Sequence, residues 1–309
     1  MVNRLARSLV GSLLLLALFL GQAGLVSADS TYSQHLVMNG HDVYSPTILK
    51  EGNVWKMWYG GWQTASDIPD DRIYYATSTD GGITWSAPTL VLYLPGIQIN
   101  DPSVVKVWNS VANRDMYVMY YTYYDRNDPI NVIALATSWD GVTWGHYGVV
   151  IPRNNGLTNT GAWSPSVVAG DANGSYFYVY YNTDPADGAV YRSKLLGATQ
   201  LVETVRVVGV DATSKKANVD VSRDASGKWW MFYNRVVGSN FNTEKMYSTD
   251  GVNWTASQYN PILYWPNYAN VTPHVVWTGT NTYALFFGFG PTDFLHFTIH
   301  RWDMTAGAE

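Results

Sequence analysis

The sequence contains no cysteine among its 309 residues, and charged residues make up only 14% of it. Without cysteine the chain has neither disulfides nor a thiolate zinc site, so its fold must depend on a hydrophobic core, which a chain of this size can build. A net charge of −5 at pH 7, with no basic cluster, argues against a nucleic-acid partner. The sequence also lacks a phosphate-cradling glycine loop and a G-x-S-x-G nucleophile elbow.

The first residues have the pattern of a secretory signal peptide. "MVNRLARS" carries Arg4 and Arg7 without an acidic residue, and an apolar run follows over residues 9–21. "LVSADS" then supplies small residues for cleavage after Ala28. The run is short for a membrane span, and nothing basic follows it. We therefore expect residues 1–28 to be removed and a single domain, residues 29–309, to be secreted to an extracellular or periplasmic location without a membrane anchor.

A pattern of short strands repeats along the mature chain. Each unit has a small oxygen-bearing residue, a short apolar strand, a Gly, Asn or Asp turn, and a second strand rich in aromatic residues; a third strand follows. With 23 Tyr, 14 Trp and no helical pattern, the chain is predicted to be all-β. The first strands of the five units begin at Ser45, Asp101, Ser164, Asp220 and Thr272.

Five units of this size predict a five-bladed β-propeller. The fifth unit ends near Trp302 without a fourth strand, and "YSQHLVM" (32–38), which precedes the first unit, can supply it. The N-terminal strand is therefore predicted to close the ring.

Three stretches match the Asp-box turn of sialidases and other propellers: "STDGGITW" (78–85), "SWDGVTW" (138–144) and "STDGVNW" (248–254). They fall between third and fourth strands, on the face predicted to lie away from the first-strand starts. Asp80 and Ser78 are expected to fix the turn through backbone amides, while Trp85 packs between sheets. We interpret these boxes as architecture. No arginine cluster for a sialidase substrate can be assembled.

Several stretches resemble the five-bladed glycoside hydrolases: "NDPSVV" (100–105), "WSPSVV" (163–168), "MWYGG" (57–61) and the "YATS-x-DG" turns. This group includes the arabinanases, β-xylosidases, invertases and levansucrases, together with the mannoside phosphorylases. The resemblance extends over nearly the whole mature chain. It implies a sugar site near the propeller axis, where one carboxylate acts as base or nucleophile, one as acid, and one orients the substrate or tunes a pKa.

Three aspartates are the candidates for these catalytic roles. Asp101 is similar to the Asp-Pro motif of the group, and Asp220 is predicted to hold the corresponding place in the fourth unit. The chain departs from the group at Ser45, where many relatives have an Asp, and Asp42 could substitute for it. Ser166 likewise stands where some relatives have a carboxylate. The alternative for each aspartate is a strand cap that binds a nearby amide.

The usual acid of the group is a glutamate, and the chain has only four, Glu51, Glu203, Glu244 and Glu309. Only Glu244, at the start of a third strand, can approach the site face. Six residues are candidates for substrate binding: Trp62, Trp163, Asn100, Arg126, His274 and Glu244. The alternative is packing between blades for Trp62 and Trp163, and a solvated surface charge for Arg126 and Glu244.

No cofactor is expected to be required. His274 is the candidate ligand for Ca²⁺ or another ion in the central channel, where some arabinanases hold a metal. The alternative is a histidine whose ring is satisfied in the core.

Two functions remain open from the sequence. A secreted glycoside hydrolase, monomeric and acting on a poly- or oligosaccharide, is favoured by the axial aspartates and by long loops that roof the same face. A non-catalytic carbohydrate-binding propeller is favoured by the incomplete carboxylate set. A structural or protein-binding propeller is a third alternative.

Overall fold

The computed structural model describes residues 35–153, 160–184, 188–210, 216–238, 240–293 and 295–306. The predicted signal peptide, residues 1–28, lies outside these ranges. Within them the one helical element is a turn of 3₁₀ helix, η1 (Ala65–Asp67), and the rest of the regular structure is β-strand. No helix in the described part of the chain is long and apolar enough to cross a membrane. The all-β prediction is confirmed.

Three sheets contain four antiparallel strands each, in chain order. The first is β2 (Asp42–Glu51), β3 (Val54–Trp62), β4 (Arg72–Ser78) and β5 (Thr89–Leu92). The second is β6 (Ile97–Asn109), β7 (Arg114–Asp125), β8 (Asp128–Ser138) and β9 (Trp144–Ile151). The third is β10 (Gly161–Ala169), β11 (Tyr176–Asp184), β12 (Val190–Leu196) and β13 (Gln200–Arg206).

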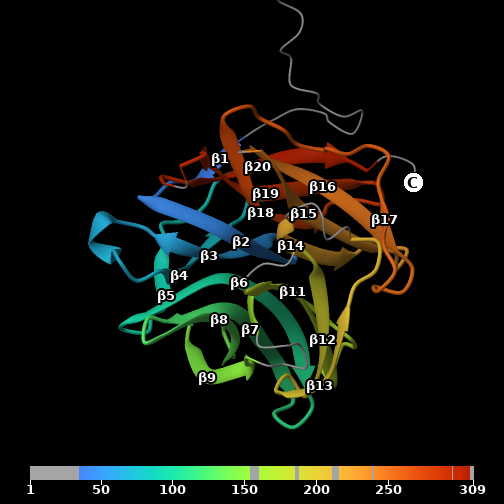
Figure 1. Cartoon of the computed structure of the whole chain (residues 1–309). Coiled ribbons are helices and arrows are strands. Elements are labelled where there is room, and N and C mark those ends of the chain that lie inside the picture. Colours follow the sequence, from blue (N-terminus) through green and yellow to red (C-terminus); the bar gives the residue numbers. More distant parts are fainter. Residues whose placement is uncertain are drawn as a thin grey trace, which may run out of the picture.

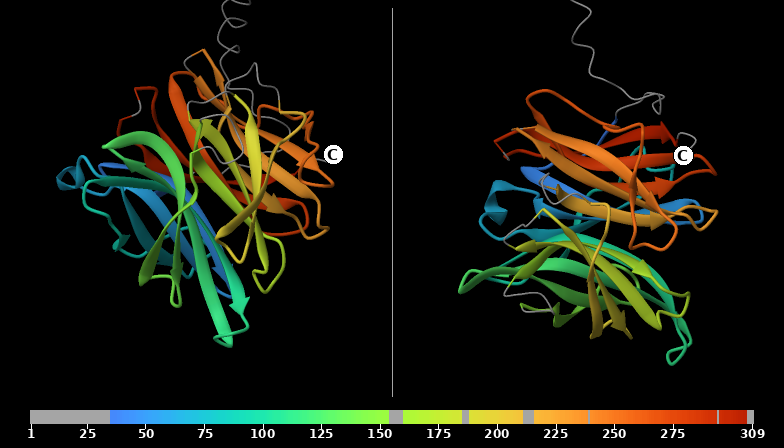
Figure 2. Two further views of the ribbon diagram at one scale, coloured as in Figure 1. Left: turned by 60° about the horizontal axis from the view of Figure 1, so that its bottom comes forward. Right: turned by 45° about the vertical axis from the view of Figure 1, so that its right-hand side comes forward.

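The remaining eight strands form one sheet with two antiparallel halves. One half is β14 (Lys216–Arg223), β15 (Trp229–Val237), β16 (Asn240–Ser248) and β17 (Thr255–Ala256). The other is β18 (Tyr268–Trp277), β19 (Thr282–Pro291), β20 (Thr298–Thr305) and β1 (His35–Met38). A single parallel pair, Phe241 with Ala269, joins the halves, and β1 pairs antiparallel with β20. The curled sheets follow one another around the molecule in chain order, from blue to red (Figures 1 and 2).

The first strand of each group, β2, β6, β10, β14 and β18, has the same irregularity near its start. The register with the next strand shifts by a bulge, and the first bulge residue has a positive φ of 49–53°. These residues are Ser45, Asp101, Ser164, Asn218 and Thr272. A positive φ is strained for residues with a side chain, so its recurrence at five equivalent places marks a feature that the surrounding structure imposes.

The bulges correct the predicted alignment of the fourth unit. Asn218, with φ of 53°, is the counterpart of Asp101, because the register shift lies between Ala217 and Asp220. Asp220 comes two positions later, where β6 has Ser103. The prediction that Asp220 corresponds to Asp101 is therefore wrong.

The Asp-box turns have the structural role that the sequence predicts. Asp80 Oδ1 accepts hydrogen bonds from the N–H groups of Ile83 (3.1 Å) and Thr84 (3.0 Å), and Ser78 Oγ accepts one from Gly82 (2.9 Å). The other two boxes repeat these contacts around Asp140 and Asp250. Neighbouring sheets pack onto the boxes: the buried Trp58 of β3 donates to the Gly141 carbonyl (2.7 Å). Ser78 pairs with Trp55, at the end of its sheet away from the bulge.

Gly61 brings the end of β3 close to the start of β2. Its φ is +117°, and an added Cβ would lie 2.2 Å from the Asp42 carbonyl oxygen. We expect Gly61→Ala to lower the free energy of unfolding by about 2 kcal/mol, because dihedral strain and steric overlap add. Gly96→Ala is the control, since Gly96 also has a positive φ (+80°) but open space around it. Urea unfolding of both variants tests this, and equal losses would contradict it.

Candidate functional site

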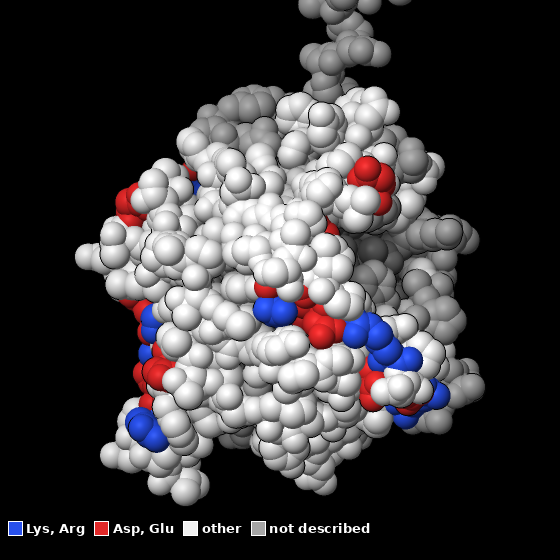
Figure 3. All heavy atoms as spheres, turned by 90° about the vertical axis from the view of Figure 1, so that its left-hand side faces the viewer, with Lys and Arg blue, Asp and Glu red and all other residues white. Residues whose placement is uncertain are grey.

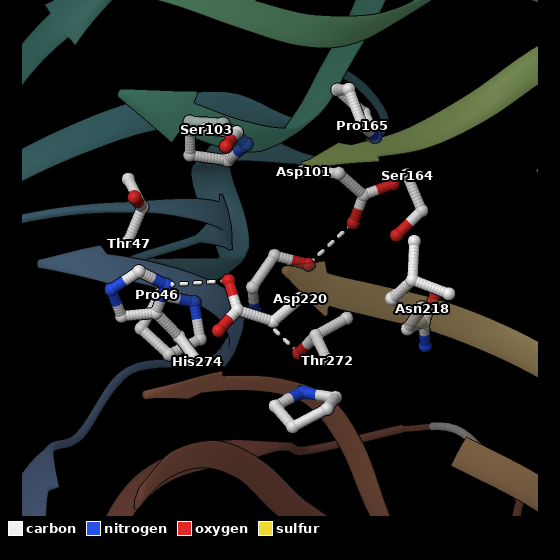
Figure 4. Close-up of a pocket in the computed structure, with 14 residues that line it drawn as sticks. Pro46, Thr47, Asp101, Ser103, Ser164, Pro165, Asn218, Asp220, Thr272 and His274 are labelled. Atoms are coloured by element: carbon white, nitrogen blue, oxygen red, sulfur yellow. Dashed lines mark hydrogen bonds and ion pairs between the residues drawn. The ribbon is translucent and has the colours of Figure 1, made fainter. Parts of the chain in front are cut away.

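The five bulged strand starts surround one small cavity of about 30 Å³ (Figure 4). Its lining consists of Ser45, Pro46, Thr47, Asp101, Pro102, Ser103, Ser164, Pro165, Asn218, Val219, Asp220, Thr272, Pro273 and His274. Such a volume suits about one water molecule, whereas pockets for organic ligands measure about 300–1,000 Å³. A sugar would therefore have to bind outside the cavity. We call the residues directly before the positive-φ positions the rim: Tyr44, Asn100, Trp163, Ala217 and Val271.

The residue two positions after each positive-φ residue carries a side chain that forms a hydrogen bond to the next strand start. These bonds join all five strand starts in a ring. A side chain there binds the backbone of the next start along the chain, and the fifth binds the first. The pairs are Thr47 Oγ1 with Val104 N (3.3 Å), Ser103 Oγ with Val167 N (2.9 Å), Ser166 Oγ with Val221 N (2.8 Å), Asp220 Oδ2 with Val275 N (2.9 Å) and His274 Nε2 with Ile48 O (3.2 Å). In the first four the side chain accepts, and in the last the imidazole donates.

Asp220 and His274 bind each other within this ring. His274 Nδ1 lies 3.0 Å from Asp220 Oδ1, and its Nε2 is held by Ile48. Burial alone lowers the pKa of His274, but the charge and hydrogen bond of Asp220 and the Ile48 carbonyl outweigh it and raise that pKa. Both ring nitrogens are engaged, so the metal role predicted for His274 is not supported. No group of three His, Cys, Asp or Glu side chains suited to a metal ion occurs in the described ranges.

Asp101 and Asp220 both line the cavity, and Asp101 is the one whose side chain binds only hydroxyl groups within the described residues. Its side chain is buried, and its two oxygens accept hydrogen bonds from the Ser45 hydroxyl and from Thr122 Oγ1 (2.9 Å). Burial raises the pKa of Asp101 to about 6, the negative charge of Asp71 adds to the rise, and the two hydroxyls oppose it. A carboxyl that titrates near 6 can exchange a proton close to neutral pH, which suits acid–base chemistry.

Asp71, at the foot of β4, is a carboxylate that sequence reasoning did not select. Its Oδ2 accepts from the Tyr44 hydroxyl (2.8 Å) and from Asn100 Nδ2 (2.9 Å), so it is tied to two rim residues. Burial raises the pKa of Asp71, while hydrogen bonds from Tyr44 and Asn100 and the charge of Arg126 oppose the rise. The signal that could have found it is the run of acids that ends the "GWQTASDIPDD" loop, directly before a strand.

Asp42 and Trp62 lie at the paired ends of β2 and β3. Asp42 is buried, and its Oδ1 accepts from the Phe297 N–H (2.8 Å), so it anchors the segment before β20 and is not part of the cavity lining. Burial raises the pKa of Asp42, and the charge of Asp71 adds to this. Trp62 is half-buried, with its ring 6.3 Å from that of His41.

The other predicted residues are distributed between the rim, the loops and the interior. Trp163 is a half-buried rim residue whose Nε1 donates to the Thr183 carbonyl (3.0 Å). Arg126 forms an ion pair with Asp70 (2.6 Å), which ties the β7–β8 turn to the β3–β4 loop. Glu244 is buried, outside the cavity lining, and accepts from the Tyr233 hydroxyl (2.6 Å).

Figure 3 views the molecule from the side on which the β3–β4 loop protrudes in Figure 1. A short row of charged side chains of both signs crosses this mostly uncharged face.

Comparison with solved structures identifies proteins of the same architecture. The catalytic domain of a family 62 α-L-arabinofuranosidase from Coprinopsis cinerea superposes with a TM-score of 0.66 at 14% identity, over 92% of this chain and 99% of that one. A thermostable family 43 glycoside hydrolase gives 0.62 at 14% identity, over 92% and 93%. The chain has the fold of these propeller hydrolases.

One solved structure that is similar to this chain is named for a different activity. An N-acetylgalactosamine deacetylase from F. plautii, solved with blood group B trisaccharide, gives a TM-score of 0.60 at 15% identity, over 90% of this chain and 94% of that one. No protein-family model and no curated protein sequence matches the chain. The comparison with solved structures confirms the resemblance stated from sequence, and at these identities it shows the fold alone.

Proposed function

We propose that the protein is a carbohydrate-active enzyme, a glycoside hydrolase whose site is the rim above Asp101. The observation that carries this is Asp101 itself, a buried carboxyl with a pKa raised to about 6, placed where the five strand starts converge. A carboxyl group with a shifted pKa that lines a polar cavity is a candidate for proton transfer. Similarity of fold to hydrolases supports the proposal as analogy.

In the same proposal, the sheets form a five-bladed propeller with β1 as the last strand of the fifth blade. Pairing of β1 with β20 and the ring of five strand starts support it. The substrate is a neutral poly- or oligosaccharide, and the partly exposed rings of Trp163 and Trp62 are the surfaces on which sugar rings would stack. We also propose export after cleavage of residues 1–28, and a monomeric state.

A non-catalytic sugar-binding propeller is the second candidate. The cavity of about 30 Å³ favours it, since no sugar ring fits there. So does Ser45, which leaves the first blade without a carboxylate at its strand start, and so do Asp220 and Glu244, which are engaged in structural contacts.

The test is product release from a substrate panel. Residues 29–309 would be incubated with arabinan, xylan, fructans and aryl glycosides, and released sugars separated by chromatography. We expect release from at least one substrate, with a rate that falls as pH rises above about 6, where Asp101 loses its proton. Asp101→Asn should lower the rate by about 10²–10⁴-fold.

Folding of Asp101→Asn would be checked by circular dichroism. Retention on one of these polysaccharides without release of sugar from any would replace the hydrolase with the binding propeller.

A further inference from the structure

The first sheet has a serine, Ser45, at the positive-φ position where the second sheet has Asp101. A carboxylate, Asp71, lies directly before another strand of the first sheet. Ser45 occupies the place that Asp101 has in the second sheet, and its hydroxyl donates to Asp101. Asp71 lies directly before β4, a strand of the same sheet as Ser45, and binds Tyr44, the residue before Ser45. It also binds Asn100, the residue before Asp101. Asp71 is thus tied to the rim on both sides of the Ser45–Asp101 contact.

The hydrogen bonds to Asp71 hold its carboxylate in one orientation and engage one of its two oxygens. Both side-chain donors, Tyr44 and Asn100, converge on Oδ2. No donor to Oδ1 occurs within the described ranges, and Oδ1 is not among their buried atoms without a partner. The backbone is fixed too, since the Asp71 carbonyl accepts from Ile99 N (3.3 Å). One carboxylate oxygen is therefore held in place while the other remains available to a ligand.

We propose that Asp71 is the second catalytic carboxylate, which acts as general base opposite Asp101 as general acid. This assignment rests on the proposed function. It excludes Asp220 from the pair, because the Asp220 oxygens are bound by His274 and by the Val275 N–H, a group that can only donate. The partners of Asp101 are hydroxyls, which can also accept a hydrogen bond from its protonated form. It also gives Asn100 and Tyr44 a positioning role, because they orient Asp71 without needing to touch the sugar.

The reaction balances with water as the only co-reactant. Asp71 takes a proton from a water molecule while the water oxygen forms a bond to the anomeric carbon. The bond from that carbon to the glycosidic oxygen breaks, and Asp101 gives its proton to this oxygen, which leaves as an alcohol. Asp101 ends ionised and Asp71 protonated, and proton exchange with solvent restores both.

Electrostatics favour this division of roles. Burial raises the pKa of Asp71, but three groups, Tyr44, Asn100 and Arg126, oppose the rise by stabilising its charge. Asp101 has only the Ser45 and Thr122 hydroxyls to stabilise its charge and is opposed by the charge of Asp71. Asp71 therefore has more groups that stabilise its ionised form than Asp101 has, which suits Asp71 to the role of base and Asp101 to that of acid.

The experiment compares Asp71→Ala, Asp71→Asn and Asp101→Asn on two substrates with the same sugar, one natural and one with a nitrophenyl leaving group. We expect each variant to lose at least ~100-fold in kcat on the natural substrate. On the nitrophenyl substrate the kcat of Asp101→Asn should return towards that of wild type, because this leaving group needs no acid. The kcat of the Asp71 variants should stay low. Formate, a small exogenous base, should partly restore Asp71→Ala and leave Asp101→Asn unchanged. A merely structural role for Asp71 would give no rescue.

Asp70→Asn is the matched control. This substitution removes one negative charge at the residue before Asp71 and keeps an oxygen that can accept from Gly96 N. We therefore expect activity within a few-fold of wild type. Circular dichroism would establish that each variant is folded, and Asp71→Asn serves if Asp71→Ala does not fold.

The outcomes separate this inference from the proposed function. If wild type releases sugar and Asp101→Asn does not, but Asp71→Asn keeps wild-type kcat, Asp71 is not the base and the hydrolase stands. If wild type releases no sugar from any substrate, the proposed function fails and the assignment of Asp71 fails with it. Loss of activity in Asp71→Ala without formate rescue would also overturn the base role.

Discussion

Asp220→Ala is expected to lower the free energy of unfolding by about 3–5 kcal/mol, the cost of removing one partner from a buried ion pair. The substitution leaves the Val275 N–H without its acceptor and His274 without its counter-charge. The contact of the Val275 N–H is buried and that of His274 is partly buried, so solvent replaces the lost contacts poorly. The loss also opens the ring between β14 and β18.

Asp220→Asn is the matched control for this prediction. The amide oxygen can still accept from Val275, and the amide N–H can donate to His274 Nδ1 once that ring is neutral. We expect a loss at pH 7 of about 1 kcal/mol or less, since only the charge is removed and the hydrogen bonds remain. Chemical denaturation of both variants measures this. Equal losses for alanine and asparagine would show that the charge, and not the acceptor geometry, stabilises the ring.

The same contact makes stability depend on pH. The folded pKa of His274 is raised above its ordinary value of 6.5, chiefly by the charge of Asp220 acting against burial. The stabilisation from this pair is therefore fully present below pH 6.5 and is lost as pH rises through the folded pKa. In Asp220→Asn this loss should disappear, which unfolding curves collected between pH 6 and 9 can measure. An unchanged pH dependence would assign it to another group.

The repeat and its turns could be predicted from the sequence because their causes are local. The Asp-box needs only a Ser and an Asp two residues apart, which accept hydrogen bonds from the amides that follow. All of these residues lie within eight positions of the sequence, so the turn can be recognised from that segment alone. The positions of the strand starts follow equally well where proline marks the bulge. In the fourth unit Val219 stands in place of that proline. The sequence pattern therefore aligns Asp220 with Asp101, although the bulge residue is Asn218.

The candidate site was harder to predict because its contacts join distant segments. Asp71 meets Tyr44 and Asn100, which lie 27 and 29 residues away, through the geometry of two sheets. His274 meets Ile48 across 226 residues, where the ring closes. Residue type alone cannot separate Asp101, whose pKa is raised by burial, from Asp220, which is bound by the His274 side chain and the Val275 N–H. Only burial and partners decide between them.

Asp101→Asn is expected to stabilise the protein while it removes activity. The folded pKa of Asp101 is about 6 against an ordinary value of 3.8, so the folded state holds this proton more tightly than the unfolded state does. Stability therefore falls as pH rises from about 4 to about 6, and the ionised form remains a cost at neutral pH. A difference of about two pKa units corresponds to roughly 3 kcal/mol, which relaxation of the site would reduce to about 1–3 kcal/mol. Asparagine avoids this cost.

The local structure can accept the amide of Asp101→Asn. Its oxygen can accept from one hydroxyl, and its N–H can donate to the other, because the oxygens of Ser45 and Thr122 also act as acceptors; Thr122 Oγ1 already accepts from Ser164 N. Such a gain on removal of a functional group is typical of sites that are arranged for chemistry at a cost in stability.

Urea unfolding of wild type and Asp101→Asn at pH 4 and pH 7 measures this effect. The variant should be more stable than wild type at pH 7, with little difference at pH 4, where Asp101 is protonated. Asp115→Asn, an exposed site with the same change of charge, controls for net charge. A destabilised Asp101→Asn at pH 7 would mean that the carboxylate is held for structure, which would favour the binding propeller over the enzyme.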